Sequence, residues 1–260
     1  MNDSNKQDPS KSKPYDIHTG HRLRLKNRFV KEGLSGFEDH QILELVLFTV
    51  IPRKDTNPLA HELLKRFGSL AAVFDASIEE LMSVKGVGLS VATHLKTYPA
   101  VFRQYELSRD NRRKCYDTLA KIGNYARKLF IGATVEQLYL IMFNNRLQII
   151  DVKLLATGTV NRAVVSPRML VDPALAAHAS CVVLVHNHPY GNTIPSRDDI
   201  SFTHVMESAC SLVDIQFLDH LVVAGNDFSS ILRTQKGFLR NSPMTGKPDE
   251  KFYRKFYGSN

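Results

Sequence analysis

Apolar positions in the first part of the chain recur at the spacing of helices. Leucine, isoleucine, valine and phenylalanine stand three or four residues apart within residues 23–30, 42–47 and 59–67, as on the buried faces of amphipathic helices. Glycine and proline interrupt these segments at Gly33, Gly36, Pro52, Gly68 and Gly86. Residues 21–110 are therefore predicted to form a small all-helical domain of several short helices.

A different pattern begins at residue 115. Short apolar runs rich in β-formers occupy residues 138–143, 147–155, 181–185 and 215–224. Helical stretches precede or separate these runs, at residues 121–131, 167–179 and 197–213. The alternation predicts an α/β domain over residues 115–238.

Three polar or charged segments are predicted to flank or join these domains. Residues 1–20 have the composition of a disordered leader. Residues 103–114 are strongly charged and lose apolar periodicity in their second half, which favours a hinge. Residues 239–260 form a basic tail whose aromatic rings could stack on bases, but a docked or disordered end is the favoured explanation.

Composition is that of a globular protein, with 43% hydrophobic and 23% charged residues. No apolar run approaches the roughly 20 residues needed to cross a bilayer, and the polar start is unlike a signal segment. We therefore expect a cytoplasmic protein with no membrane partner. The three cysteines are far apart and form no C-x-x-C, which indicates reduced thiols rather than disulfides or a thiolate metal site.

Charge points to an anionic partner. The formal net charge is +8, from 34 Lys and Arg against 26 Asp and Glu, and the basic excess lies at the two ends of the chain. Residues 11–31 contain one acid, Asp16, among many bases: Lys11, Lys13, Arg22, Arg24, Lys26, Arg28 and Lys31. Nucleic acid is the usual partner of such a segment, while a solubilising tail followed by a solvated helix face remains the alternative.

The densest chemical pattern lies at residues 185–199, VHNHPYGNTIPSRDD. His186 and His188 are two residues apart at the end of an apolar run, and alternation along a strand places both imidazoles on one face. Asp199 could supply a third ligand, leaving one position of a catalytic zinc site to water. The alternative is structural, because Ser196 and Asp199 also have the spacing of a helix cap. Both interpretations can hold together.

A hydrolytic metal site also needs a group that handles protons. Glu136 is the leading candidate, since it directly precedes the apolar run at residues 138–143. Its alternative is an exposed acid beside a strand.

The whole pattern resembles a known signature. His186-Asn187-His188, seven residues, then Ser196-x-x-Asp199 is similar to the JAMM (MPN+) metallopeptidase motif, in the form carried by the bacterial RadC family. Gly158-Thr159, Pro167-Arg168 and Asp219-His220 followed by Ser229 are similar to that family's flanking segments. The resemblance covers roughly residues 22–238. It implies a cytidine-deaminase-like α-β-α fold, preceded by a small helix-hairpin-helix domain.

The resemblance also implies roles for the matching positions. His186, His188 and Asp199 would be Zn²⁺ ligands, Glu136 the general acid/base, and Ser196 a hydrogen-bond donor to the developing oxyanion. Tyr190 stands where the family usually has serine, and we expect it to point into the loop and affect access. The implied reaction is hydrolysis of a peptide or isopeptide bond by metal-activated water. Iron and manganese are also compatible with His and Asp ligands.

A second motif lies at residues 83–95, SVKGVGLSVATHL. Gly86 and Gly88 permit a tight turn whose backbone amides, at the start of the next helix, can hold a phosphate. With Lys85, this segment resembles a helix-hairpin-helix that contacts the DNA backbone independently of sequence. The alternative is a helical module that binds a protein.

Three functions therefore remain open. The first is a zinc-dependent hydrolase acting on a peptide or protein substrate, delivered to DNA by its helical domain. The second is a DNA repair or recombination accessory protein that binds or processes DNA. The third is a non-catalytic scaffold stabilised by a metal.

Overall fold

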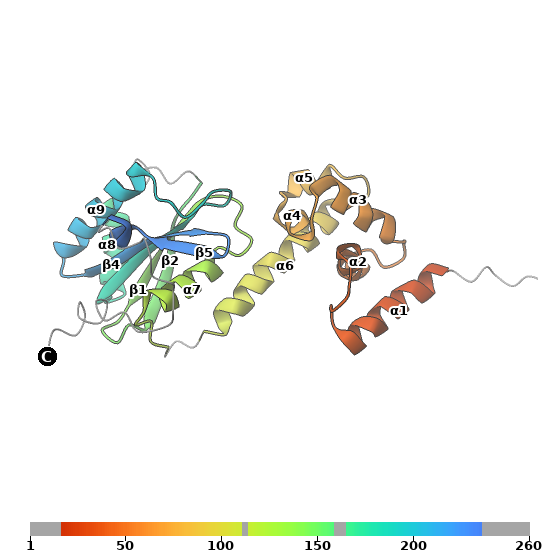
Figure 1. The fold of residues 1–260 in the computed structure, drawn as a ribbon, viewed down its shortest axis with the longest axis horizontal. Coiled ribbons are helices and arrows are strands. Elements are labelled where there is room, and N and C mark those ends of the chain that lie inside the picture. Colours follow the sequence, from red (N-terminus) through yellow and green to blue (C-terminus); the bar gives the residue numbers. More distant parts are fainter. Residues whose placement is uncertain (1–16, 111–113, 159–164, 236–260) are drawn as a thin grey trace, which may run out of the picture. The chain divides into compact units, whose positions relative to one another are not determined.

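The computed structural model describes residues 17–110, 114–158 and 165–235. The described chain forms two compact units, which divide between Tyr98 and Pro99, and Figure 1 shows the elements of each. The predictions for the leader before residue 17, for Thr159 and for the basic tail concern residues outside this description. In the described parts, no helix is both long and apolar enough to cross a bilayer.

The first unit is built from helices, as the apolar spacing predicts. Their bounds are α1 (Ile17–Glu32), α2 (Asp39–Val50), α3 (Asn57–Phe67), α4 (Leu70–Asp75), α5 (Ile78–Met82) and α6 (Leu89–Ser108). Helix α1 begins before residue 21, the predicted start of the helical domain. The core of the unit consists of aliphatic side chains from α2 to α6, including the fully buried Leu43, Leu63, Leu81 and Leu95.

Local sequence explains where these short helices start and stop. Gly68 ends α3 in the left-handed conformation, with φ of 90°, which glycine adopts at little cost. Ser69 then starts α4 by accepting a hydrogen bond from the Ala72 amide. Ser77 and Glu80 form a reciprocal capping box at the start of α5. The turns are therefore fixed by side chains close in sequence.

The second unit contains a five-stranded mixed sheet. Its strands are β1 (Gln137–Phe143), β2 (Ile149–Thr157), β3 (Cys181–Asn187), β4 (Gln216–Ala224) and β5 (Asp227–Ser230). Its helices are the end of α6, α7 (Leu119–Leu129), α8 (Pro167–Ala176), α9 (Arg197–Ser211) and α10 (Ile231–Gln235). Strand β5 and helix α10 are too short to stand out in the sequence pattern, which does not predict them.

The strand order is β2-β1-β3-β4-β5. Strand β3 pairs with β1 in the antiparallel sense and with β4 in the parallel sense. Helix α9 makes the crossover between β3 and β4, as a parallel pair requires. The residues that follow β3 therefore lead directly to the start of α9 at one end of the sheet.

Helices cover both faces of this sheet (Figure 1). One core cluster joins α7 to the sheet side chains that include Ile141 and Val183. The other joins α8 and α9 to the opposite face, which includes Leu140 and Leu184. The result is a three-layer α-β-α arrangement, and the predicted fold class is confirmed.

The segment predicted as a hinge is partly ordered by ion pairs. Helix α6 continues through Ser108, beyond the start of the predicted segment at residue 103. Lys128 of α7 lies 2.8 Å from an Asp110 carboxylate oxygen and donates to the Glu106 carbonyl at 3.2 Å. The end of α6 is thus held against α7 within the second unit.

Candidate metal centre

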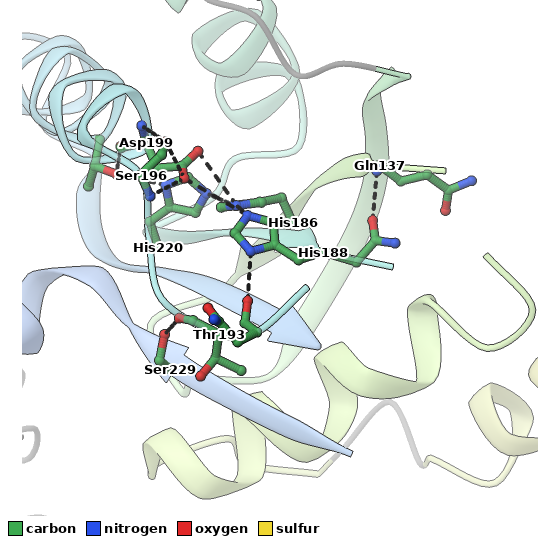
Figure 2. Close-up of polar contacts among 11 residues, drawn as sticks. Gln137, His186, His188, Thr193, Ser196, Asp199, His220 and Ser229 are labelled. Carbon is green, nitrogen blue, oxygen red and sulfur yellow. Dashed lines mark hydrogen bonds and ion pairs between the residues drawn. The ribbon is translucent and has the colours of Figure 1, made fainter. Parts of the chain in front are cut away.

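Strand β3 and helix α9 bring together the three residues of the predicted metal site. His186 Nε2 lies 3.0 Å from His188 Nε2 and 3.6 Å from Asp199 Oδ1, and His188 Nε2 lies 4.0 Å from Asp199 Oδ2. Figure 2 shows the two rings and the carboxylate turned toward one another. These nitrogen and oxygen atoms lie within 4.8 Å of one another, so the group can hold a metal ion.

A capping box aims the Asp199 carboxylate. The Ser196 amide and hydroxyl both donate to Asp199 Oδ2 at 2.7 Å, and the Asp199 amide donates to Ser196 Oγ at 3.0 Å. The cap is therefore compatible with the ligand interpretation, because Oδ1 is the oxygen turned toward His186. The Ser196 hydroxyl proton is engaged within the cap in this arrangement.

The loop after β3 sets the orientation of His188. His188 Nδ1 lies 2.7 Å from the Asn192 carbonyl oxygen. A carbonyl only accepts, so Nδ1 carries the proton and Nε2 of the neutral ring presents a lone pair. The atoms facing Asp199 thus include an unprotonated imidazole nitrogen, the form in which histidine binds a metal. The residues present fit a divalent cation with nitrogen and oxygen ligands.

His186 is buried, and His220 of β4 contacts it from behind. His186 Nδ1 lies 2.8 Å from His220 Nε2, because parallel pairing places the two strands side by side. Burial lowers the pKa of His186 to about 4, against the opposing effect of the Asp199 charge. Burial also holds the pKa of His220 well below its usual value, and the neighbouring His186 and His188 lower it further. Both rings are uncharged near neutral pH.

Glu136 lies at the same end of the sheet. Leu138 pairs with His186 across the β1–β3 ladder, and the Gly158 amide donates to the Glu136 carbonyl at 2.8 Å. Glu136 therefore lies one residue before β1, which begins at Gln137. Side chains two apart on an extended chain share a face, so we expect the Glu136 side chain on the face of Leu138 and its partner His186.

Asn187, the residue between the two histidines, contacts the strand that follows Glu136. Its side-chain oxygen accepts from the Gln137 amide at 2.7 Å, and its amide nitrogen donates to the Val135 carbonyl at 3.1 Å. Figure 2 shows the contact to Gln137. Asn187 is 3% exposed, so its amide is largely shielded from competing water.

The loop contains one departure from expectation. Tyr190 is 87% exposed, so it extends into solvent, and the expectation that it points into the loop is wrong. Inside the loop, His188 Nδ1 donates to the Asn192 carbonyl, and the Ser229 hydroxyl of β5 donates to the Thr193 carbonyl. Backbone groups hold this loop in place, which leaves the Tyr190 ring without a packing role inside it.

The predicted DNA-contacting loop lies in the first unit, between α5 and α6. Val84 and Val87 are buried, and the Val87 amide donates to the Val84 carbonyl at 3.0 Å. Lys85, Gly86 and Gly88 are exposed between and after these anchors. Gly86 has a φ of 97°, a conformation that suits glycine. The turn thus presents its backbone to solvent at the start of the long helix α6.

Comparison with known proteins agrees with both predicted regions. Residues 116–237 match the RadC-like JAB domain, and residues 57–105 match the helix-hairpin-helix motif. A UPF0758 protein of Ruegeria pomeroyi is 36% identical over 203 residues, which make up 78% of this chain and 91% of the relative. The chain belongs to the RadC family. Another UPF0758 protein, from Fusobacterium nucleatum, is 32% identical over 222 residues, with 82% of this chain and 95% of the relative covered.

Membership of the RadC family confirms the resemblance inferred from the H-x-H and S-x-x-D pattern. The sequence pattern assigns no role to three further side chains, of which Asn187 contacts the backbone beside Glu136 and Thr203 and His220 lie behind the candidate ligands. A polar pair, Asp219 and His220, inside the apolar run at residues 215–224 was a detectable sign that β4 carries more than core residues.

Proposed function

We propose that this RadC-family protein is a zinc-dependent hydrolase of peptide or isopeptide bonds. The observation that carries the proposal is the convergence of His186 Nε2, His188 Nε2 and the Asp199 carboxylate. Three protein ligands with an open fourth position are typical of catalytic zinc sites, whereas structural sites are closed by four. When bound, the metal would polarise the substrate carbonyl and lower the pKa of water to about 7.

The proton-transfer role falls to Glu136. The pairing of Leu138 with His186, two residues after Glu136, supports the assignment of Glu136 as the base that takes a proton from the attacking water. The same carboxyl group would then pass the proton to the leaving nitrogen. Backbone contacts from Asn187 on either side of Glu136 support a fixed position for this residue.

Ser196 would stabilise the negative oxygen of the tetrahedral intermediate. Its hydroxyl proton is donated to Asp199 Oδ2 at 2.7 Å, so this role requires rotation about the Cβ–Oγ bond. The oxygen can still accept from the Asp199 amide after that rotation, so the helix cap would survive.

The test begins with metal content. The purified full chain should contain about one zinc, and a His186→Ala, His188→Ala double variant should lose it. His204→Ala is a matched control, because His204 is an exposed histidine on α9 that pairs with Glu207. Retention of full metal by the double variant would remove the site assignment.

Catalysis is tested separately with a library of quenched fluorescent peptides. The Glu136→Gln variant should keep its zinc and lose at least 100-fold in turnover. Zinc-dependent nuclease activity without peptide cleavage would instead favour a DNA-processing protein. Loss of stability on chelation, with no turnover of either substrate, would favour a metal-stabilised scaffold.

We also propose that the helical unit contacts the DNA backbone. Support comes from the helix-hairpin-helix match over residues 57–105 and from the exposure of Lys85, Gly86 and Gly88. Amides at the start of a helix have no partner within the helix and attract phosphate. Such contacts are independent of base sequence.

Fluorescence anisotropy with a random-sequence duplex tests this contact. Affinity of the full chain should fall as salt rises, and Lys85→Ala should reduce the slope of log affinity against log salt by about 1. Lys121→Ala serves as the control, because Lys121 lies on α7 and pairs with Asp117. Equal salt dependence in wild type and Lys85→Ala would contradict the assignment.

A further inference from the structure

A buried chain of hydrogen bonds joins two of the candidate metal ligands. His186 Nδ1 lies 2.8 Å from His220 Nε2, and His220 Nδ1 lies 2.7 Å from Thr203 Oγ1. Thr203 Oγ1 in turn lies 2.6 Å from the Asp199 carbonyl oxygen. His186, Thr203 and His220 are all at most 2% exposed. The chain thus starts at one ligand's ring and ends on the backbone of another.

Only one arrangement of protons satisfies every contact in this chain. The Asp199 carbonyl cannot donate, so the single Thr203 hydroxyl proton must be donated to it. His220 Nδ1 must then donate to Thr203 Oγ1. The neutral His220 ring has no second proton, so its Nε2 accepts from His186 Nδ1. His186 therefore carries its proton on Nδ1, and its Nε2 is bare.

The same conclusion holds for the other ring by a separate contact. His188 Nδ1 donates to the Asn192 carbonyl at 2.7 Å, so in the neutral form of the ring Nε2 is bare as well. The 3.0 Å approach of the two Nε2 atoms then has no proton between them. Two lone pairs and the Asp199 carboxylate face one another, which is an arrangement that attracts a cation.

We propose that His220 and Thr203 are positioning residues that hold His186 in the tautomer able to bind the metal. The inference rests on the proposed metal site and deepens it. Without the Thr203 hydroxyl, no acceptor favours a proton on His220 Nδ1. His220 can then carry its proton on Nε2 and donate it to His186 Nδ1. His186 would then carry its proton on Nε2, where it blocks the ligand position.

Matched variants at Thr203 separate this role from packing. Thr203→Val keeps the shape of the side chain and removes the hydroxyl, whereas Thr203→Ser keeps the hydroxyl and removes the methyl group. Loss of a hydrogen-bond partner behind a ligand typically weakens metal binding 10- to 100-fold. Zinc affinity of the full chain, measured by competition with a chromophoric chelator, should fall by that factor in Thr203→Val. It should stay within about threefold of wild type in Thr203→Ser.

Nitrogen-15 NMR of the histidine rings gives a readout that packing alone would not move. In the metal-free wild type, His186 should show the form protonated at Nδ1, with its resonance assigned by loss in His186→Ala. In Thr203→Val it should shift to the form protonated at Nε2. A His220→Gln variant, whose amide can both accept and donate, should retain more affinity than His220→Leu.

The outcomes distinguish the two proposals. If wild type and Thr203→Val bind zinc equally well and the His186 tautomer is unchanged, the positioning role of Thr203 and His220 is overturned. The proposed metal site is unaffected by that result. A wild-type protein that binds no zinc overturns the proposed function. If Thr203→Val fails to fold, the wild-type spectrum decides alone, because an Nε2-protonated His186 in the metal-free protein contradicts the inference.

Discussion

Asn187 holds the backbone on both sides of Glu136. Its side chain accepts from the Gln137 amide and donates to the Val135 carbonyl, at 2.7 and 3.1 Å. The residue between the two histidines thus reaches the strand that carries the candidate acid/base. The last two residues of β3 and the residue that follows therefore supply two candidate ligands and support the backbone around the candidate acid/base.

Replacing Asn187 should loosen the start of β1 without emptying the metal site. Asn187→Leu has a similar volume but makes neither hydrogen bond, so the Gln137 amide should exchange with solvent about 10 to 100 times faster. Hydrogen-exchange mass spectrometry of peptides covering residues 135–138 measures this change. Zinc content should stay at the wild-type value. Unchanged exchange at Gln137 would show that the ladder with β2 suffices to hold Glu136.

Removing the Ser196 hydroxyl should affect stability and metal affinity together. Ser196→Ala deletes the side-chain cap of α9 and one donor to Asp199 Oδ2, so we expect a loss of about 1 kcal/mol in the free energy of unfolding. We also expect roughly tenfold weaker zinc binding. Urea unfolding of the metal-free protein and chelator competition measure the two effects. Ser196→Thr keeps the hydroxyl and should change both little; weak zinc binding there would point to sterics instead.

Asp219 should give the protein a distinct dependence on pH. Burial raises the pKa of this β4 residue to about 6, although hydrogen bonds from Ser230, His220 and Leu232 and the charge of Arg233 oppose the shift. The folded state therefore keeps the proton that the unfolded chain releases near its ordinary pKa of 3.8. Stability contributed by this group is full below about pH 4 and is lost as pH rises through about 6.

Asp219→Asn removes that titration. Relative to the variant, the metal-free wild type should lose about 1 to 3 kcal/mol between pH 4 and pH 7. His186 and His220, whose pKa values are lowered, act in the opposite direction but are common to both proteins, so the difference isolates Asp219. Urea unfolding across this range in the presence of a chelator is the measurement. Parallel curves for the two proteins would exclude a raised pKa.

Gly123 of α7 should not tolerate a side chain. An added Cβ would overlap the ring of Phe228 on β5. Phe228 packs in the core cluster that joins α7 to the sheet. Gly123→Ala should therefore destabilise the protein by about 1 to 3 kcal/mol, despite the gain of up to about 1 kcal/mol that alanine usually brings to a helix. The smaller ring-free side chain in Phe228→Leu should relieve the clash.

A double-mutant cycle in urea checks this contact. The Gly123→Ala change should cost less in the Phe228→Leu background than in wild type. Equal costs in both backgrounds would mean that the helix shifts away from β5 instead of clashing with it.

The candidate site was predictable to the extent that its residues are close in sequence. Alternation along a strand places His186 and His188 on one face, and the spacing from Ser196 to Asp199 fixes a helix start; both follow from local geometry. The relay does not. His220 contacts His186 because β3 and β4 pair in parallel with Leu184 opposite His220. The spacing of residues along the chain does not predict that register.

The fold shows the same division. Long periodic stretches, such as α9 and β4, lie close to their predicted bounds. Strand β5 has four residues and forms because β4 is present to pair with it, so its own sequence pattern is weak. Tyr190 was expected inside its loop, but the backbone carbonyls of the loop already satisfy His188 and Ser229, and the ring is left in water.

Asp199 has three functions at once. Its carboxylate caps α9 and faces the two histidines, and its backbone carbonyl accepts the hydrogen bond from Thr203. Transplanting the H-x-H and S-x-x-D segments alone onto another scaffold would therefore not reproduce the site. A portable unit would have to include the β4 histidine and a full turn of helix beyond the aspartate, which is a larger piece of protein than the short signature suggests.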